Sequence, residues 1–415
     1  MTKHLLILGG GTSGTMMTNH LRRRLPADEW RMTVVDRSEK HLYQPGLLFL
    51  PFGIYQESDI LRDTRDFIPR GAEFIQSEIE RISQESHLVT LSGGRELVYD
   101  ILIIATGCRT APEETEGMLG PKWRVNVHDF YTLDGARALR SKLAEFQGGR
   151  VVVHVNEMPI KCPVAPLEFT FLADTFFRER GLRDRITLTY VTPLSGAFTK
   201  PRASKKLSHL LGDKGIELVT DFVAERVDQE HDKLVCYDGR EVPYDLLITT
   251  PTNMGDASVQ RSSIGDDLNY IPTHKHTLQS LKDPDVFVIG DATNLPASKA
   301  GSVAHFESET LADTILLHIA GKPLKEEFDG HSNCFIESGN GKALLIDFSY
   351  EHEPHEGRFP FRFGPLRLLE ESRLNHWGKL AFRHVYWNLL LKGRPLPGIS
   401  RTKKKPIDSK TTKES

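Results

Sequence analysis

The chain has 415 residues, of which 39% are hydrophobic and 26% charged, with a net charge of −3. This is the composition of an ordinary globular protein with room for two or three domains. The near-neutral charge excludes a nucleic-acid footprint at the level of the whole chain. Four cysteines without a CxxC spacing exclude a disulfide scaffold and give no zinc motif, so we expect no metal site.

The two ends of the sequence carry no targeting signal that we can recognise. A strand begins at residue 3 without a preceding signal peptide, and no apolar run approaches the roughly 18 residues of a transmembrane span. The last residues, 401–415, are polar and lysine-rich, and we expect them to be disordered.

The first motif is a nucleotide-binding turn. The stretch "HLLILGGGTSGTMM" reads as strand, glycine turn and helix, with Gly9, Gly11 and Gly14 in the GxGxxG pattern. A second strand, "RMTVVD", ends at Asp36, 22 residues after Gly14, where an acid binds the ribose hydroxyls of a dinucleotide. Strand, turn, helix and acid together predict a dinucleotide site.

Two later strands indicate which dinucleotide is bound. "YDILIIATG" and "DVFVIGDAT" resemble the paired signatures of flavoprotein reductases with two dinucleotide-binding domains. The resemblance implies an FAD domain formed by residues 1–110 and 265–330. It implies these FAD-binding residues: Gly9, Gly11, Ser13, Gly14, Asp36, Arg37, Gln44, Ile79, Ala105, Thr106, Gly107, Gly290, Asp291, Lys299 and Gly301. Lys299, at a predicted helix start, would stabilise negative charge on the reduced flavin; the alternative is a solvated surface lysine.

The sequence contains an internal repeat. "GRELVYDILIIATG" at 94–107 matches "GREVPYDLLITTPT" at 239–252, and a hairpin-like stretch precedes each copy. This duplication predicts a second nucleotide-type domain at 111–264. Where its glycine loop should follow the strand "GRVVVHV", the chain has "NEMPIKCPVAPLEF".

This replacement loop argues against NAD(P)H binding. Proline has no N–H to donate to a phosphate, and Glu157 and Glu168 add negative charge where a pyrophosphate would lie. The next strand, "TLTYV", is not followed by an acid. We therefore predict that the second domain has lost its nicotinamide site and that the electrons come from another donor.

Four motifs in order resemble the sulfide:quinone oxidoreductases, most closely the type III branch: "YQPGLLFLPFG", "PIKCPVAPLEF", "NCFIESGNGKALLIDF" and "ESRLNHWGKLAFRHVYWNLL". The resemblance implies an α/β fold of two Rossmann-type domains, the second degenerate, with a membrane- and quinone-binding region at 331–400. It also implies sulfide oxidation, electron transfer through FAD to a membrane quinone, and peripheral (monotopic) membrane attachment, for which we favour the cytoplasmic face. "HLYQPG" lacks a cysteine, so we expect non-covalent FAD. A homo-oligomer is left open.

The same resemblance assigns the catalytic residues. It implies that Cys162 and Cys334 are a redox pair beside the flavin and that Glu168 moves protons there. Hydrosulfide would attack one sulfur of the oxidised pair, leaving a persulfide and a thiolate. Taken alone, the two cysteines could equally be unrelated buried side chains.

The other cysteines have weaker assignments. Many relatives carry a third cysteine in the segment that matches 124–135, and this chain has none there. Cys108 follows the ATG motif and is the weaker candidate for a redox partner. Cys236 is expected on an edge strand, with a structural role.

The C-terminal region is rich in aromatic residues, including Trp377 and Trp387. An apolar helical stripe runs through Leu374, Trp377, Ala381, Val385 and Leu389. Aromatic residues with basic neighbours suit a bilayer interface; the alternative is a helix that covers its own core. The resemblance implies a quinone site of Phe335, Phe363, Lys379 and Phe382.

Three other functions remain open at this stage. A type II NADH:quinone oxidoreductase is disfavoured by the missing second glycine loop. A flavocytochrome c-type sulfide dehydrogenase is disfavoured because we expect no signal sequence. A flavin-binding protein with a decayed redox site is disfavoured by the presence of Cys162, Glu168 and Cys334.

Overall fold

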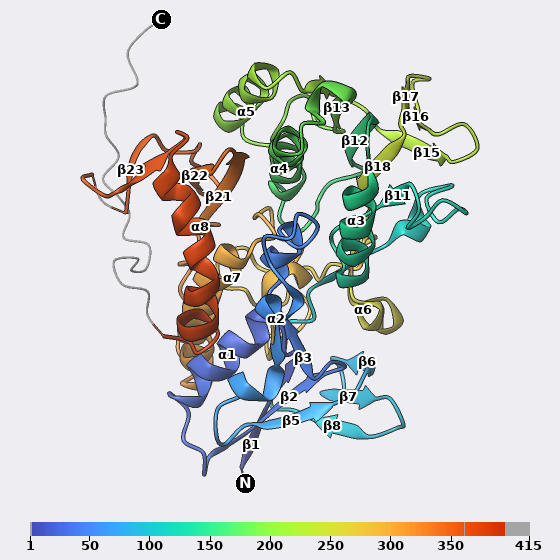
Figure 1. The fold of residues 1–415 in the computed structure, drawn as a ribbon. Coiled ribbons are helices and arrows are strands. Elements are labelled where there is room, and N and C mark those ends of the chain that lie inside the picture. Colours follow the sequence, from blue (N-terminus) through green and yellow to red (C-terminus); the bar gives the residue numbers. More distant parts are fainter. Residues whose placement is uncertain (1, 361, 395–415) are drawn as a thin grey trace, which may run out of the picture.

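The computed structural model describes residues 2–360 and 362–394. It contains two parallel five-stranded sheets and a four-stranded C-terminal sheet. Figure 1 shows how these parts are arranged. The α/β fold with two Rossmann-type sheets is therefore confirmed. The predicted disordered tail at 401–415, and residues 395–400 of the predicted C-terminal region, lie outside the described residues.

The first sheet is formed by both ends of the FAD-domain sequence. Its strand order is β20-β9-β1-β2-β5, and all its pairs are parallel. Its strands are β1 (Lys3–Leu8), β2 (Trp30–Asp36), β5 (Glu73–Gln76), β9 (Ile101–Ile104) and β20 (Val286–Val288). Helices α1 (Thr12–Arg22) and α7 (Gly301–Ile319) pack against each other beside this sheet. The central strands are apolar and buried on both faces, as parallel sheets require.

The second sheet lies above the first in the view of Figure 1, in green. Its strand order is β11-β18-β12-β13-β14, again with parallel pairs. Its strands are β11 (Val127–His128), β12 (Gly149–Val155), β13 (Ile186–Val191), β14 (Glu217–Val219) and β18 (Leu246–Thr250). The helices of this part are α3 (Leu133–Glu145), α4 (Ala165–Glu179) and α5 (Pro201–Asp213). Helix α6 (Ala257–Ser262) packs instead on β6 (Ile79–Ser83) of the first domain. The chain passes from the first sheet to the second and back through β10 (Cys108–Thr110) and β19 (Asn253–Gly255), and these two strands pair antiparallel.

The internal repeat has the same structure in both copies. A three-stranded antiparallel sheet precedes β9, and a second one precedes β18. The first contains β6 (Ile79–Ser83), β7 (Leu88–Leu91) and β8 (Glu96–Val98). The second contains β15 (Ala224–Asp228), β16 (Lys233–Cys236) and β17 (Glu241–Pro243). Cys236 is therefore on the middle strand, and our prediction of an edge strand is wrong; the side chain is buried in an apolar cluster.

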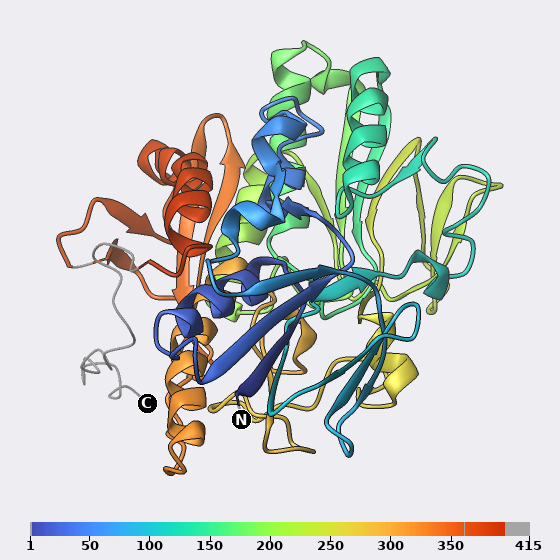
Figure 2. The same ribbon diagram turned by 90° about the horizontal axis from the view of Figure 1, so that it is seen from below.

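The C-terminal unit is the red part of Figures 1 and 2. Its sheet has the order β21-β22-β24-β23, and α8 (Arg373–Val385) packs against β22 and β21. The strands are β21 (Ser332–Gly339), β22 (Lys342–Phe348), β23 (Gly357–Phe359) and β24 (Leu366–Leu368). Asn340 and Gly341, a dipeptide typical of two-residue hairpin turns, connect β21 and β22 and have the positive φ values of 53° and 66° that this turn requires. The unit touches the second domain where β21 packs on α4.

Short elements complete the first domain between β2 and β5. They are β3 (Lys40–Leu42), the 3-10 turns Gln44–Leu48 and Thr64–Phe67, α2 (Glu57–Ile60) and β4 (Leu61–Asp63). Among residues 2–360 and 362–394, no helix combines the length and the apolar character needed to cross a bilayer.

Candidate active site

The glycine turn of the first sheet is held tightly against β9. Gly9 has φ of +102°, and a Cβ there would lie 2.3 Å from the carbonyl oxygen of Ala105. A Cβ on Gly14 would lie 1.8 Å from the carbonyl oxygen of Gly9. Larger residues would therefore push the turn off the sheet. A Cβ on Gly11, in contrast, would meet nothing within 4 Å, so the turn faces open space on that side.

The surroundings of this turn fit FAD. Helices α1 and α7 both begin without a side-chain cap, which leaves the N–H groups of their first turns for an anion. Asp36, at the end of β2, accepts from the N–H of Gly10 at 2.6 Å and of Ser38 at 2.8 Å. The hydroxyl of Thr106 is buried without a hydrogen-bond partner among the described residues. A dinucleotide offers partners for all of these groups.

The other predicted cofactor residues are spread along the same edge. A Cβ on Gly290 (φ +72°) would lie 2.3 Å from Oγ of Ser13. The Gly290–Asp291 turn, which we call the GD motif, therefore packs directly on α1. Gly107 (φ +69°) and Gly301 both face open space. Arg37 and Gln44 are exposed, and Ile79 at the start of β6 is half-buried.

Lys299 is buried, which contradicts the alternative of a solvated lysine. Its Nζ donates to the carbonyl oxygens of Asp291 at 3.0 Å and Thr293 at 2.7 Å, and it lies over the Tyr270 ring. Burial lowers the pKa of Lys299, and the charge of Asp291 opposes that effect. Lys299, which stands just before α7, therefore binds the turn at Asp291 and Thr293 through its side chain.

Glu307 is a buried carboxyl on α7 that the sequence did not reveal. It accepts from the N–H of Gly290 at 2.7 Å, directly behind the GD motif. Burial raises the pKa of Glu307 to about 7, and the neighbouring charge of Asp291 adds to this. Only its position two turns into a long helix could have indicated a core-facing acid.

The loop between β12 and α4 brings Cys162 to the junction of the two domains. Cys162 has φ of +49°, and its N–H donates to the carbonyl oxygen of Lys299 at 2.6 Å. Its own carbonyl accepts from the N–H of Ala165 at 2.9 Å and the hydroxyl of Tyr131 at 3.3 Å. The loop is thus attached to the segment that leads into α7. This places it next to the FAD cradle, by which we mean the Gly9–Gly14 turn and the first turns of α1 and α7.

Cys334 lies on β21, and both cysteines are partly buried free thiols. Its Sγ lies 3.9 Å from the hydroxyl of Ser302 on α7 and 4.0 Å from that of Ser332. Burial raises the pKa of both thiols, and the charges of Glu168 and Cys334 raise the pKa of Cys162 further. The structure therefore brings the two predicted redox residues into one electrostatic environment.

Glu168 and Lys379 form a buried ion pair beside these thiols. Glu168, on α4, is fully buried, and its Oε1 accepts from Nζ of Lys379 and from the N–H of Glu337 at 2.7 Å. Its Oε2 is buried without a partner among the described residues. Burial raises the pKa of Glu168, although Lys379 opposes the shift. Burial also opposes the charge on Lys379, but the carboxylates of Glu168 and Glu337 outweigh it and raise that pKa.

The position of Glu168 corrects one step of the sequence argument. We took it to add negative charge where a pyrophosphate would lie, but its side chain is neutralised by Lys379 inside the protein. Lys379 also donates to the carbonyl oxygen of Phe335 at 3.0 Å, which places the pair beside the predicted quinone residues.

Two further residues extend this cluster toward the surface. Glu337, also on β21, has a side chain that is only 1% exposed, and both its carboxylate oxygens lie 3.0 Å from Nδ1 of His376. His376 is one turn before Lys379 on α8, and its side chain is 21% exposed. Sequence reasoning missed both, because nothing local marks a pair 39 residues apart.

The exposed side of α8 carries large apolar side chains between the basic residues Arg373 and His384. Trp377 is 65% exposed and Leu374 47%, and Phe363 in the preceding loop is 91% exposed. Ala381 continues this side, whereas the helix ends at Val385. Phe335 and Phe382 are half-buried; Phe335 packs so closely that a Cβ on Gly378 would lie 2.9 Å from its ring.

Trp387 is only 1% exposed, so its predicted place at a bilayer interface is wrong. A single π-helical turn, Tyr386–Leu390, follows α8 and turns its aromatic side chains inward. Trp387 stacks on Phe67, and the Tyr386 hydroxyl lies 2.7 Å from Thr12 Oγ1 and from His41 Nε2. This turn attaches the C-terminal unit to the FAD domain.

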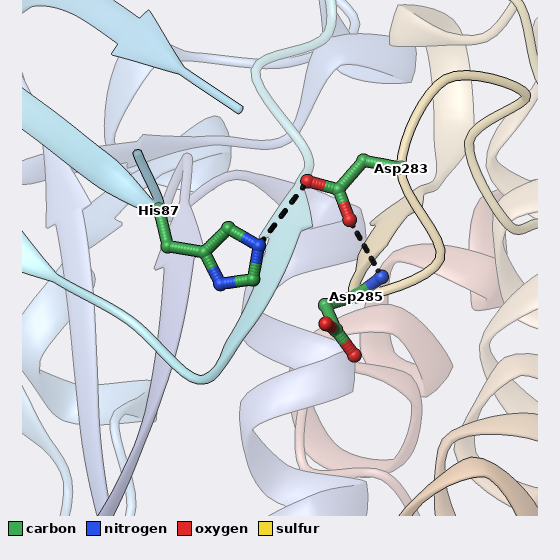
Figure 3. A group of neighbouring side chains, drawn as sticks. All are labelled: His87, Asp283 and Asp285. Atoms are coloured by element: carbon green, nitrogen blue, oxygen red, sulfur yellow. Dashed lines mark hydrogen bonds and ion pairs between the residues drawn. The ribbon is translucent and has the colours of Figure 1, made fainter. Parts of the chain in front are cut away.

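One group of His and Asp side chains in the described part of the chain has potential metal ligands close together. Figure 3 shows His87, Asp283 and Asp285, whose ligand atoms lie within 4.8 Å of one another. Asp283 accepts from the N–H of Asp285 at 2.8 Å, and Asp285 pairs with His318 at 2.6 Å. These contacts account for the cluster as ion pairs, and we assign it no ion.

Comparison with known proteins agrees with this geometry. No protein-family model matches the chain. The mouse mitochondrial sulfide:quinone oxidoreductase is 27% identical over 395 residues, which cover 94% of this chain and 86% of that protein. The Dictyostelium discoideum mitochondrial enzyme of the same name is 26% identical over 399 residues, with the same coverage.

A solved structure agrees in fold over almost the whole chain. The sulfide:quinone oxidoreductase from the hyperthermophilic bacterium Aquifex aeolicus superposes with a TM-score of 0.79 at 20% identity, covering 95% of this chain and 92% of that one. The sequence relatives and the fold point to the same group of proteins. The chain is therefore similar to sulfide:quinone oxidoreductases in sequence and in fold over nearly its whole length.

Proposed function

We propose that this chain is an FAD-dependent sulfide:quinone oxidoreductase that oxidises sulfide at Cys162 and Cys334. The observation that carries the proposal is the convergence of both thiols, the buried Glu168 and Lys379 next to the FAD cradle. The flavin, when bound, accepts two electrons from the sulfur chemistry and passes them to a quinone. The finer assignment to the type III branch stays a prediction.

The thiols supply the sulfur chemistry by thiol–disulfide exchange. Hydrosulfide attacks one sulfur of the oxidised Cys162–Cys334 pair, so that a new S–S bond forms and the old one breaks. One cysteine leaves as a thiolate and the other carries a persulfide. Each further hydrosulfide lengthens this chain by one sulfur only with the loss of two more electrons, which FAD, when bound, would accept and pass to a quinone, until polysulfide or sulfur is released.

Glu168 is suited to accept and return a proton during these steps. Its pKa is raised by burial, which brings a carboxyl nearer to neutral pH, where general bases work best. Its unpartnered Oε2 can accept a hydrogen bond from a bound S–H group. Lys379 keeps the other oxygen in place and prevents the carboxyl from being an isolated buried charge.

The second domain supports this function over NADH oxidation. The N–H groups of its loop are used inside the protein: Lys161 donates to Asn253 Oδ1 at 3.1 Å, and Cys162 donates to Lys299. Its prolines, Pro159, Pro163 and Pro166, have no N–H to offer. A pyrophosphate would find few donors there.

We further propose that the exposed side of α8, with Phe363, contacts a membrane surface. The exposed Trp377 and Leu374 lie on one side of the helix, which suits a shallow interfacial contact. A quinone drawn from the bilayer would then reach Phe335, Phe382 and Lys379. We keep the division into an FAD domain (1–110 and 265–330), a second domain (111–264) and a quinone region (331–400) as part of this proposal.

One experiment separates this function from the alternatives. The purified yellow protein, mixed with sulfide under anaerobic conditions, should lose the visible absorbance of its oxidised flavin. NADH at the same concentration should not reduce it. Reoxidation by a long-chain quinone should restore the absorbance. Rapid reduction by NADH, or no reduction by sulfide, would contradict the proposal.

A flotation assay tests the membrane contact. Trp377→Glu and Phe363→Glu place charges on the proposed contact surface, and the double variant should no longer float with liposomes. Arg358→Glu, an exposed position on β23, serves as a charge-change control. Flotation of the double variant at the wild-type level would show that the contact lies elsewhere.

A further inference from the structure

The reaction proposed above consumes protons, and its balance defines what the protein must supply. Oxidation of HS⁻ to zero-valent sulfur releases two electrons and one proton. Reduction of a quinone to a quinol takes up two electrons and two protons. The sum, HS⁻ + quinone + H⁺ → S⁰ + quinol, requires one proton from the solvent in every turnover. The quinone side therefore needs a route for that proton into a buried site.

Within the described residues, a series of titratable groups leads from the surface toward Lys379. It begins at His376, which is partly exposed on α8, and continues to the carboxylate of Glu337 at 3.0 Å. The N–H of Glu337 donates to Glu168, and Lys379 donates to the same Glu168 oxygen. We propose that His376 and Glu337 deliver the solvent proton to the Glu168–Lys379 pair, which passes it to the quinone.

The sequence positions of these groups suit a relay. His376 and Lys379 are three residues apart on α8, so both side chains lie on the same side of the helix. Glu337 lies under that side, on β21, the same strand that carries Cys334 and Phe335. The charge of Glu337 raises the pKa of both Glu168 and Lys379, so the proton occupancy of each group responds to the others.

The remaining link is between the carboxylate of Glu337 and the ion pair. These groups are coupled electrostatically, and a bridging water would carry the proton across. Other titratable or charged groups face the same cluster from neighbouring elements. They are Arg383 on α8, Tyr43, Tyr55 and Asp59 in the segment before β4, Tyr131 just before α3, and the thiols Cys162 and Cys334.

None of these neighbours offers an equivalent entrance. Arg383 is paired with Asp59, and a guanidinium does not release its proton in proteins. Burial raises the pKa of Tyr43 and of Tyr55, so neither phenol gives up a proton near neutral pH. Within this cluster, His376 combines partial exposure with an imidazole, the side-chain type that exchanges protons most readily near neutrality.

The inference rests on the proposed function, and separate half-reactions keep the two distinguishable. The variants are His376→Ala and Glu337→Gln, and the matched control is His384→Ala, an exposed histidine on the same helix. Stopped-flow absorbance follows flavin reduction by sulfide and, separately, reoxidation by quinone across neutral and alkaline pH. If sulfide fails to reduce the wild type, the proposed function fails, and the relay has no reaction to serve.

We expect flavin reduction by sulfide to stay within about two-fold of wild type in His376→Ala and in the control. Reoxidation by quinone in His376→Ala should slow at least about ten-fold at alkaline pH, and its rate should fall with rising pH more steeply than in wild type. Added imidazole should restore much of the rate. A pH-indicator dye should show that the uptake of about one proton per turnover is slowed in parallel, while the control resembles wild type.

Three results would overturn the proposal. Equal slowing of both half-reactions would indicate a general structural effect of the substitution. A reoxidation rate with the wild-type pH profile would show that the proton enters elsewhere. Proton uptake as rapid as in wild type in both His376→Ala and Glu337→Gln would also show that the proton enters elsewhere. Thermal unfolding of each variant, measured with the flavin bound, identifies loss of fold independently of activity; if His376→Ala unfolds, Glu337→Gln and His376→Gln with imidazole rescue decide the question.

Discussion

The buried Glu168–Lys379 pair allows a quantitative test of the site. Lys379→Met removes the positive charge and keeps most of the side-chain volume, so that Glu168 remains buried without its partner. Removal of one partner of a buried pair destabilises a protein by about 3–5 kcal/mol. For a cooperative unit of about 150–250 residues this corresponds to a lowering of Tm by roughly 6–20 °C.

The double variant Glu168→Gln with Lys379→Met provides the control. It removes both charges, and replacement of a whole buried pair by neutral groups is often neutral or even stabilising. The N–H of Glu337 would still find an acceptor in the side-chain amide oxygen that the first substitution introduces. We therefore expect the double variant to be more stable than Lys379→Met alone, by about 2 kcal/mol or more.

The penalty in Lys379→Met should depend on pH. Without Lys379 the folded-state pKa of Glu168 rises further, whereas the unfolded chain keeps an ordinary glutamate pKa of about 4.3. The variant therefore keeps its full stability below the unfolded-state pKa. Between that value and the folded-state pKa of Glu168, its free energy of unfolding falls by about 1.4 kcal/mol per pH unit. The assay is urea denaturation at about pH 4, below the unfolded-state pKa, and at about pH 8, well above it, followed by circular dichroism and flavin fluorescence. A single-variant penalty below about 1 kcal/mol at the higher pH, or a double variant as unstable as the sum of the single ones, would refute this account of the pair.

The remaining predictions concern separate parts of the molecule. Cys162→Ser and Cys334→Ser should each abolish sulfide-dependent quinone reduction with FAD still bound, whereas serine at the other two cysteines should leave most of the activity; full activity in either of the first two would remove the pair from the mechanism. Heat or acid should release FAD into the supernatant, and colour retained in the precipitate would show a covalent link. Glu307→Gln should remove a stability loss of up to about 3 kcal/mol that wild type shows between roughly pH 4.5 and about 7, because burial raises the pKa of this acid in the fold; an unchanged pH profile of urea unfolding would count against this. Trp387→Ala should cost about 3–5 kcal/mol without reducing liposome flotation, since the ring is in the core, and a loss of flotation in a folded variant would contradict that position.

Local sequence patterns predicted the parts of the fold that depend on local backbone requirements. The glycines of the first turn are needed because β9 approaches too closely for a Cβ, and the Asn340–Gly341 turn needs positive φ at both residues. The hairpin-like stretches predicted before the repeat copies at 94–107 and 239–252 correspond to two matching three-stranded sheets, because each copy contains its own strand and turn signals. Such signals are complete within a few residues, so no knowledge of the tertiary structure was required.

Helical periodicity alone could not identify the membrane-facing side of α8. The stripe from Leu374 to Leu389 is correct as a pattern, but the helix ends at Val385 and a π-helical turn changes the direction of the next side chains. Trp377 is therefore exposed and Trp387 is in the core. A break in helical geometry follows from tertiary packing against His41 and Phe67, which the sequence pattern does not contain.

The charged groups of the site were predictable only where a family motif contained them. Glu168 and Lys379 were found through the resemblance, whereas Glu337, His376 and Glu307 were not. Each of the latter pairs with a group far away in the chain or with a backbone N–H of another element. Because charged residues are usually solvated, a sequence gives no reason to place a particular one in the interior. The buried position of Lys299 was missed for the same reason.

The two nucleotide-type domains differ in what their first loops do with backbone N–H groups. In the first domain the glycine turn faces open space at Gly11 and α1 is uncapped, so its donors are free to bind a phosphate. In the second domain the N–H of Cys162 is already bonded to Lys299, and that of Ala165 to Cys162. A phosphate loop requires donors without partners, and a loop that fixes a reactive thiol requires the opposite. The same strand–loop–helix scaffold therefore binds a dinucleotide in one domain and holds a cysteine against the flavin domain in the other.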